Sequence, residues 1–245
     1  MIKKHIPNFI TLMNLLFGCV AVIFAVQGNL LLSGAFVCLG IFFDFFDGLA
    51  ARLLNVKSDL GLQLDSLADM VTSGVVPGII MCQLIATALG DHAGSNLLSS
   101  DTPWMVYVGL IITLASCYRL AKFNIDDRQT DAFIGLPTPA NAIFILSLAL
   151  IADQQSNSFL VTWIENPYIL ILISVLSALI LNAELKLFSL KVKNLNFKTN
   201  WYRYFILILS VLGLVIFKYV AIPFIIVLYI LLSIIVNTNS EQKEN

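Results

Sequence analysis

Long apolar runs separated by short polar breaks follow one another along almost the whole chain. A helix that crosses the hydrocarbon core of a bilayer needs about 20 apolar residues, because that core is about 30 Å thick. Runs that approach or exceed this length lie at about 8–27, 30–52, 61–89, 104–123, 138–152, 167–184, 203–218 and 220–236. The pattern predicts an all-α integral membrane protein with about eight transmembrane helices.

The overall composition agrees with this interpretation. Hydrophobic residues make up 59% of the chain and charged residues 12%, whereas a soluble domain carries about 25% charged residues. The chain has no basic stripe with interleaved aromatic residues, so we expect membrane lipid and no nucleic acid among its partners.

The positions of lysine and arginine predict how the chain crosses the membrane. If the N-terminus is cytoplasmic, thirteen of the fourteen basic residues fall on the cytoplasmic side and only Lys218 falls on the other. An excess of basic residues in cytoplasmic loops is the usual arrangement. We therefore expect a multi-pass protein of the cell (inner) membrane with both termini cytoplasmic.

Four aspartates lie where the apolar pattern makes acids costly. Asp44 and Asp47 end the second run, and Asp65 and Asp69 begin the third. A charge at the centre of a membrane helix costs about 2.5–3.5 kcal/mol, so such acids are functional candidates. Spacings of three and four residues put each pair on one helical face, and the short polar connection makes the two helices antiparallel neighbours. The four carboxylates should converge at the cytoplasmic ends of these helices.

Two arrangements would relieve the repulsion between these carboxylates. Some could be protonated, as in the proton relay of a transporter, although the C-terminal half has no second aspartate cluster of the kind that internal repeats would give. Alternatively, hard divalent cations could bind, and ligands that offer only oxygen favour Mg²⁺ or Mn²⁺. The neighbours favour the cation, because Gly48 and Ala51 leave room for a large group and Arg52 suits a phosphate. Asp59, in the connecting loop, is interpreted as an ordinary helix-start residue.

Written out, residues 44–69 read D-x2-D-G-x2-A-R-x8-G-x3-D-x3-D. This stretch resembles the full signature of the CDP-alcohol phosphotransferase family. The resemblance implies two divalent ions, Mg²⁺ or Mn²⁺, and an alcohol that displaces CMP from a CDP-linked lipid. It makes Asp44, Asp47 and Asp65 metal ligands, and Asp69 both a ligand and the general base. The residues that it assigns to the CDP-linked lipid are Asn8, Thr11, Asn14, Gly48, Ala51, Arg52, Ser58 and Gly61.

A second segment bears on which alcohol is used. Residues 118–124 and 133–140 resemble the RxxRFN and GLPTPA pattern of membrane-type phosphatidylserine synthases, with Lys122 where arginine is usual. The resemblance implies CDP-diacylglycerol and L-serine as substrates, and Arg119, Lys122 and Asn124 as the serine-binding residues. The alternative is that Arg119 and Lys122 are ordinary cytoplasmic basic residues and that the acceptor is glycerol 3-phosphate or an inositol.

The same resemblance divides the chain into two parts. We expect residues 1–184 to form a catalytic core of six transmembrane helices. Residues 185–245 should add a basic cytoplasmic loop, two further helices and a short polar tail. We also expect a homodimer whose active sites face the cytoplasm.

Overall fold

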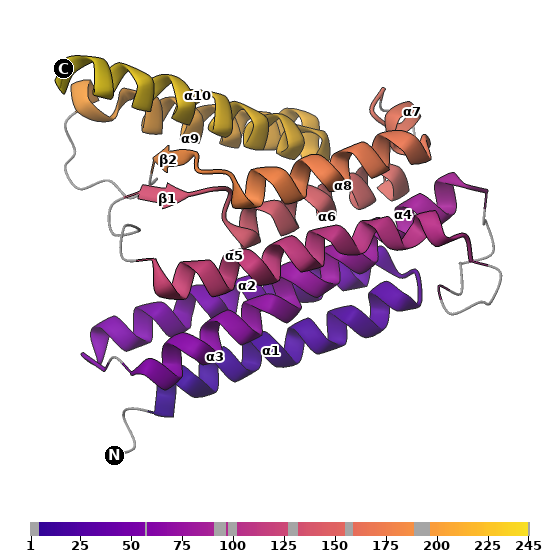
Figure 1. Ribbon diagram of the computed structural model, residues 1–245, viewed down its shortest axis with the longest axis horizontal. Helices are drawn as coiled ribbons and strands as arrows, with labels where there is room; N and C mark the ends of the chain where they lie inside the picture. The colour runs from indigo at the N-terminus through magenta and orange to yellow at the C-terminus, as the bar shows by residue number, and fades with distance from the viewer. Residues whose placement is uncertain are drawn as a thin grey trace.

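The computed structural model describes residues 5–56, 58–90, 97, 102–126, 132–154, 159–188 and 197–244. Long helices within these ranges run side by side along one axis (Figure 1). The first part of the chain forms α1 (His5–Val26), α2 (Leu30–Leu53), α3 (Asp59–Asp69), the π-helix η2 (Met70–Val75), α4 (Val76–Ala88), the 3-10 helix η3 (Trp104–Leu110) and α5 (Ile111–Ile125). The second part forms α6 (Thr138–Gln154), α7 (Val161–Ile164), α8 (Pro167–Asn182), α9 (Phe197–Phe217), the 3-10 turn η4 (Lys218–Val220) and α10 (Ala221–Glu244).

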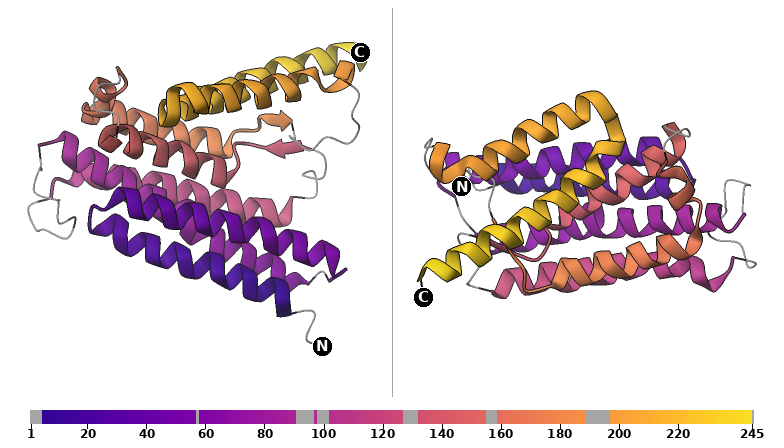
Figure 2. Two further views of the ribbon diagram at one scale, coloured as in Figure 1. Left: turned by 180° about the vertical axis from the view of Figure 1, so that it is seen from behind. Right: turned by 90° about the horizontal axis from the view of Figure 1, so that it is seen from above.

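The predicted all-α membrane fold is confirmed. Five helical segments are long and apolar enough to cross a membrane, at His5–Val26, Leu30–Leu53, Asp59–Ala88, Trp104–Ile125 and Asn200–Val236. The last segment contains both α9 and α10, which fold back on each other at η4 (Figure 2). The helices α6 and α8 are shorter but also apolar. Each of the eight predicted runs therefore corresponds to a helical segment of the structure, and the chain is a multi-pass membrane protein.

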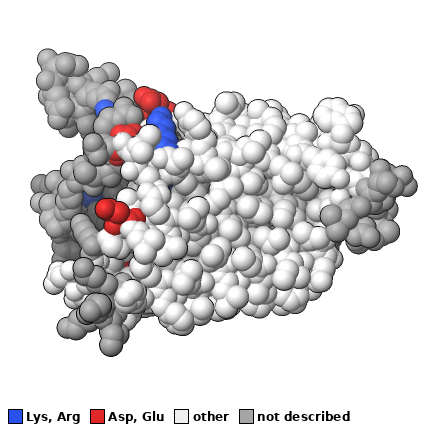
Figure 3. Space-filling model, turned by 60° about the horizontal axis from the view of Figure 1, so that its bottom comes forward, with Lys and Arg blue, Asp and Glu red and all other residues white. Residues whose placement is uncertain are grey.

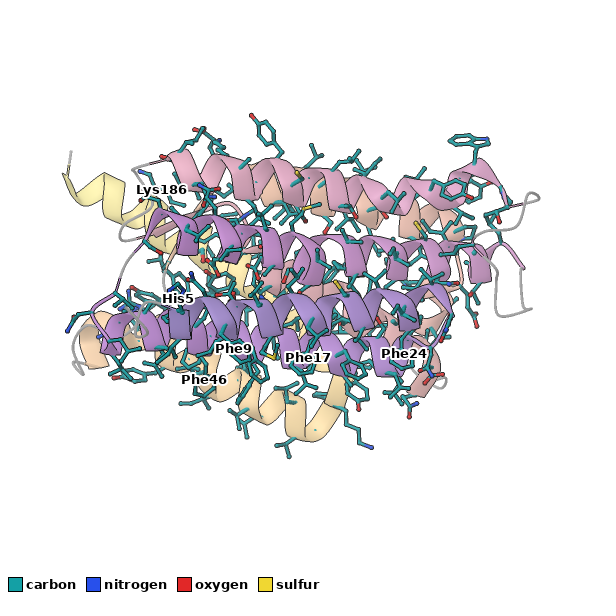
Figure 4. The ribbon with its side chains drawn as sticks, turned by 90° about the horizontal axis from the view of Figure 1, so that it is seen from below. His5, Phe9, Phe17, Phe24, Phe46 and Lys186 are labelled. Carbon is teal, nitrogen blue, oxygen red and sulfur yellow. The ribbon has the colours of Figure 1, made fainter. Side chains whose placement is uncertain are left out.

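Both chain ends lie at the same end of the bundle (Figure 1). His5 and Lys186 lie at this end (Figure 4), and Arg52 and Lys122 lie in the last turns of α2 and α5 that reach it. In Figure 3 the visible charged side chains gather there, while the rest of the described surface on that face carries no charge. The structure thus separates a polar end from an apolar body, as the sequence predicts.

Phenylalanine rings line the contact between α1 and α2. Phe9, Phe17 and Phe24 follow one another along α1 (Figure 4). The ring of Phe36 in α2 lies 6.1 Å from that of Phe17 and 5.5 Å from that of Phe24, and Phe43 lies 5.1 Å from Phe17. These contacts hold the two helices together up to the turn that carries Asp44 and Asp47.

The core lies around α4. In the most apolar stretch of the segment Asp59–Ala88, which ends with α4, 72% of the residues are buried, against 28% in α1 and α2. Ile80, Met81 and Ile85 of α4 are fully buried and belong to the same apolar cluster as Ile112 and Ile145 from α5 and α6. The third predicted run is therefore the central helix of the bundle, and its N-terminal extension α3 carries Asp65 and Asp69.

A small β-ribbon was not predicted from the sequence. Strands β1 (Ala132–Ile134) and β2 (Lys186–Phe188) pair antiparallel, with Phe133 opposite Leu187. The ribbon contacts the last helix, because the hydroxyl of Tyr229 in α10 donates to the carbonyl of Phe188 at 2.9 Å. The C-terminal hairpin is thus attached to the segment that leads into α6.

Gly109 lets η3 pack closely against α4. A Cβ atom there would lie 2.8 Å from the backbone nitrogen of Cys82 and 3.0 Å from the carbonyl oxygen of Gly78. Because these are backbone atoms, we expect Gly109→Ala to destabilise the fold by about 1–3 kcal/mol. The thermal unfolding midpoint of the detergent-purified protein measures this effect.

Gly34→Ala is the matched control for Gly109→Ala. Its Cβ would meet only the flexible end of the Leu146 side chain, at 3.3 Å. Equal unfolding midpoints for the two variants would contradict the packing described around Gly109.

Candidate active site

The four aspartates converge at the polar end of the bundle. Asp44 and Asp47 lie in the C-terminal part of α2, and Asp65 and Asp69 lie in α3. One carboxylate oxygen each from Asp44, Asp47 and Asp65 lies within 4.8 Å of the others. The Asp44 side chain also contacts those of Asp65 and Asp69. The structure therefore brings together all four acids that the spacing predicts to meet.

Two polar residues of α1 donate hydrogen bonds to this cluster. The Thr11 hydroxyl donates to Oδ2 of Asp47 at 2.5 Å, and Nδ2 of Asn14 donates to Oδ1 of Asp69 at 3.3 Å. Both donors are buried. Neutral donors from α1 therefore orient one acid of α2 and one of α3.

A cavity of about 550 Å³ opens beside the cluster. Its lining residues are Pro7, Asn8, Thr11, Asp47, Gly48, Ala51, Val56, Ser58, Asp59, Gly61, Leu62 and Asp65. Most residues assigned to the CDP-linked lipid by resemblance are in this set, but Asn14 and Arg52 are not. Asp59 begins α3, as predicted, but it also lines the cavity, and its place between the two acid pairs was the available signal.

The rim of the cavity is fixed by local backbone contacts. Ser58 caps α3, because its Oγ accepts from the backbone N–H of Gly61 at 3.0 Å. A Cβ on Gly61 would lie 3.1 Å from that Oγ and 3.3 Å from Oδ1 of Asn8. Gly61 thus lets α1 and α3 approach closely. The exposed Arg52 folds back, and its Nε donates to the carbonyl oxygen of Gly48 at 2.9 Å.

Arg119 approaches the cluster from α5. Arg119 is only 7% exposed, and its guanidinium interacts electrostatically with Asp69. Its Nε has no hydrogen-bond partner among the described residues. A buried guanidinium with an unpaired donor is costly unless a ligand completes its hydrogen bonds. This arginine therefore differs from an ordinary basic residue at a helix end, which would extend into water.

The other two residues assigned to serine have protein partners. Lys122 forms an ion pair with Glu184 at 3.3 Å. Oδ1 of Asn124 accepts from the Ser66 hydroxyl at 3.0 Å, and its Nδ2 donates to Oε1 of Gln63 at 3.3 Å. Asn124 thus ties the end of α5 to the residues of α3 on either side of Asp65.

The chemistry of the cluster fits divalent metal ions. Its ligands are carboxylate oxygens on two helices, and among the described residues no lysine or arginine lies within ion-pair distance of the four aspartates. Hard cations such as Mg²⁺ and Mn²⁺ prefer such oxygen ligands. A cation would offset the charge repulsion that the neutral donors Thr11 and Asn14 leave in place.

Comparison with known protein families matches residues 4–180 to the CDP-alcohol phosphatidyltransferase family. The chain belongs to this family. The match covers all four aspartates, the cavity and Arg119, whereas α9 and α10 lie beyond it. The family uses divalent metal ions, and Asp44, Asp47 and Asp65 form a carboxylate group that could bind one.

Individual CDP-alcohol phosphatidyltransferases are similar to the chain over part of their length. The CDP-diacylglycerol–serine O-phosphatidyltransferase of Bacillus subtilis (strain 168) is 34% identical over 147 residues, which cover 60% of this chain and 76% of that protein. The enzyme of the same name from Methanocaldococcus jannaschii is 32% identical over 171 residues, or 70% of this chain and 69% of that protein. The Helicobacter pylori (strain J99) enzyme is 28% identical over 150 residues, which are 60% of this chain and 58% of that protein.

We expect Asp47→Asn to weaken Mn²⁺ binding at least about tenfold, because a ligand charge is lost from the cluster. Thr11→Val should weaken it less, since it removes only the hydrogen bond that orients Asp47. Isothermal titration of the purified protein with Mn²⁺ measures both effects. Asp153→Asn is the control, because Asp153 is an exposed acid in the last turn of α6, beside the α1–α2 turn at the other end of the bundle. Equal affinities for Asp47→Asn and the control would exclude Asp47 as a ligand.

Proposed function

We propose that this chain is a phosphatidylserine synthase, which transfers the phosphatidyl group of CDP-diacylglycerol to the hydroxyl of L-serine and releases CMP. The observation that carries this proposal is the convergence of four aspartates between a cavity lined by small and polar residues and the buried Arg119. The similarity to CDP-diacylglycerol–serine O-phosphatidyltransferases supports serine as the acceptor.

The cavity takes the CDP group of the lipid. Gly48, Ala51 and Gly61 keep side chains out of it, while Asn8 and Ser58 offer polar atoms at its rim. The diacylglycerol chains then extend along the apolar body of the bundle. Arg52 contributes its guanidinium to a phosphate of the donor, because only its Nε is held by the Gly48 carbonyl.

The four aspartates hold two divalent ions, Mg²⁺ or Mn²⁺. When bound, these ions offset negative charge on the phosphoryl oxygens and on the departing CMP. Asp69 also acts as the general base, and the Asn14 amide keeps its carboxylate oriented. It takes the proton of the serine hydroxyl while the serine oxygen bonds to the phosphorus that carries diacylglycerol. The bond from that phosphorus to the CMP oxygen breaks, and CMP leaves.

Arg119 binds the carboxylate of serine. Its burial beside Asp69 and its unpaired Nε support this role, since a planar guanidinium can hold a carboxylate with two parallel hydrogen bonds. The predicted contacts of Lys122 and Asn124 to serine stay predictions. They require these side chains to exchange or share their partners Glu184, Ser66 and Gln63.

The orientation and assembly also stay proposals. The polar end of the bundle, with the aspartates and both termini, faces the cytoplasm of the cell (inner) membrane, in keeping with the distribution of basic residues. Residues 1–184 form the catalytic core, and residues 185–245 attach to it through β2 and Tyr229. The enzyme works as a homodimer.

An assay of the purified protein tests this function. With CDP-diacylglycerol and Mn²⁺ or Mg²⁺ we expect CMP release that depends on L-serine, and phosphatidylserine identified by mass spectrometry. Asp69→Asn should lower turnover at least about a thousandfold, because the base and a metal ligand are both lost, whereas Asp153→Asn should retain it. CMP release that requires glycerol 3-phosphate or inositol would exclude serine as the acceptor. Absence of CMP release with every alcohol would exclude the enzyme function itself.

We expect Arg119→Gln to raise KM for serine about 10- to 100-fold, because a charged hydrogen bond to the serine carboxylate is lost. KM for CDP-diacylglycerol should change by less than about twofold, because the donor occupies the other side of the cluster. Steady-state kinetics with each substrate varied separately measure both constants. Arg203→Gln is the control, because the Nε of this α9 arginine also has no partner among the described residues, but its Nη1 donates to Asn200 and it lies outside the family match. An unchanged KM for serine in Arg119→Gln would contradict the assigned role.

A further inference from the structure

The chain leaves α-helical geometry directly after Asp69. Residues Met70–Val75 form the π-helix η2 in the middle of an otherwise continuous helix from Asp59 to Ala88. Such single π-turns interrupt the regular helical pattern and are frequent at functional sites. A neighbouring helix supplies a hydrogen-bond donor to the backbone of this turn, because the Thr113 hydroxyl of α5 donates to the carbonyl oxygen of Gly74 at 3.0 Å. The turn also directs the fully buried Thr72 toward α1.

Thr72 begins a chain of hydrogen bonds that ends at Asp69. Its hydroxyl donates to Oδ1 of Asn14 at 2.8 Å, and Nδ2 of Asn14 donates to Oδ1 of Asp69 at 3.3 Å. A carboxylate can only accept, so the amide must direct its nitrogen to Asp69 and its oxygen to Thr72. The threonine hydroxyl has one proton, and donating it to that oxygen holds the amide in this orientation. The same hydroxyl also lies 3.3 Å from the backbone carbonyl oxygen of Asn14, and its single proton goes to the closer Oδ1.

Two glycines leave the space that the side chains of Thr72 and Asn14 occupy. A Cβ on Gly40 of α2 would lie 2.6 Å from Cγ2 of Thr72 and 2.8 Å from Oδ1 of Asn14. A Cβ on Gly18 of α1 would meet the Thr72 side chain and lie 3.2 Å from its backbone nitrogen. Both glycines are buried, as are Thr72 and Asn14, which are 0% exposed. The two polar side chains are thus enclosed between α1, α2 and η2, with little freedom to rotate.

We propose that Thr72 and Asn14 are positioning residues that orient the Asp69 carboxylate for proton transfer and metal binding. This inference rests on the role proposed for Asp69. Asn14 is not among the residues that line the cavity, and its amide nitrogen donates to Asp69, so its effect is assigned to the orientation of that carboxylate. Thr72 lies outside the D-x2-D signature, and its function comes from the hydroxyl and not from the volume of its side chain.

Two matched pairs of variants separate the hydroxyl from the volume. Threonine and valine have the same shape, and only threonine has the hydroxyl. Thr72→Ser and Thr72→Ala differ from each other only by the hydroxyl, and both lack the γ-methyl group. We expect Thr72→Val and Thr72→Ala to lower kcat about 10- to 100-fold. Thr72→Ser should stay within about threefold of the unmodified enzyme, because it keeps the donor to Asn14.

The measurements are kcat and KM for both substrates, with the thermal unfolding midpoint of each variant. A positioning role lowers kcat and leaves KM for CDP-diacylglycerol within about twofold, whereas a disturbed cavity would raise that KM. If Thr72→Val does not fold, the serine and alanine variants still provide the comparison. The proposal would be overturned if Thr72→Val had the kcat of the unmodified enzyme. It would also be overturned if Thr72→Ser lost as much kcat as Thr72→Ala.

Asp69→Asn, assayed beside these variants, distinguishes a failure of the role of Asp69 from a failure of the role of Thr72. If Asp69→Asn is inactive and the Thr72 pairs do not differ, Asp69 keeps its proposed role and the positioning role of Thr72 is wrong. If Asp69→Asn retains turnover, the proposed role of Asp69 is wrong, and with it the purpose assigned to Thr72 and Asn14.

Discussion

Mutual repulsion between carboxylates at the end of an apolar bundle is the constraint on which the rest of this structure depends. Asp44, Asp47 and Asp65 bring oxygens within 4.8 Å of one another, and Asp69 contacts Asp44. Charges removed from water require compensation by hydrogen bonds and opposite charge. In this structure, neutral hydrogen-bond donors from α1 provide part of this compensation. Members of the CDP-alcohol phosphatidyltransferase family use divalent cations, which would provide the opposite charge. The same acids that repel one another in the unliganded bundle thus form a carboxylate group that could bind metal.

The position of this cluster suits a substrate that is half lipid. The apolar body of the bundle provides a surface for acyl chains, and its polar end carries the acids, the cavity and the basic side chains. In the proposed reaction, the phosphorus atom that links diacylglycerol to CMP lies at the boundary between these two regions. The bundle therefore determines where the reacting group lies, and side chains on α1, α2, α3 and α5 provide the chemistry.

The sequence predicted the parts of the fold and site that depend on local spacing. Eight apolar runs became helical segments, and intervals of three and four residues brought the aspartates to common faces. It did not predict features that arise from contacts between distant segments. The β-ribbon and the Lys122–Glu184 ion pair join residues that are distant in the sequence. The π-helix is local, but it is supported by a partner on another helix, the Thr113 hydroxyl of α5. Asn14 was assigned to the nucleotide by resemblance to the family's opening segment, and no local pattern indicates its hydrogen bond with Thr72, 58 residues away.

The central claim is that the four aspartates bind a pair of divalent cations. Electron paramagnetic resonance of the purified protein, titrated with Mn²⁺, tests it most directly. The account predicts two bound ions per chain that couple magnetically, because ions in two-metal sites lie about 3.5–4 Å apart. It also predicts that Asp65→Asn abolishes the coupled signal while Asp153→Asn retains it. A spectrum of isolated ions only, or a coupled signal that survives Asp65→Asn, would contradict the account.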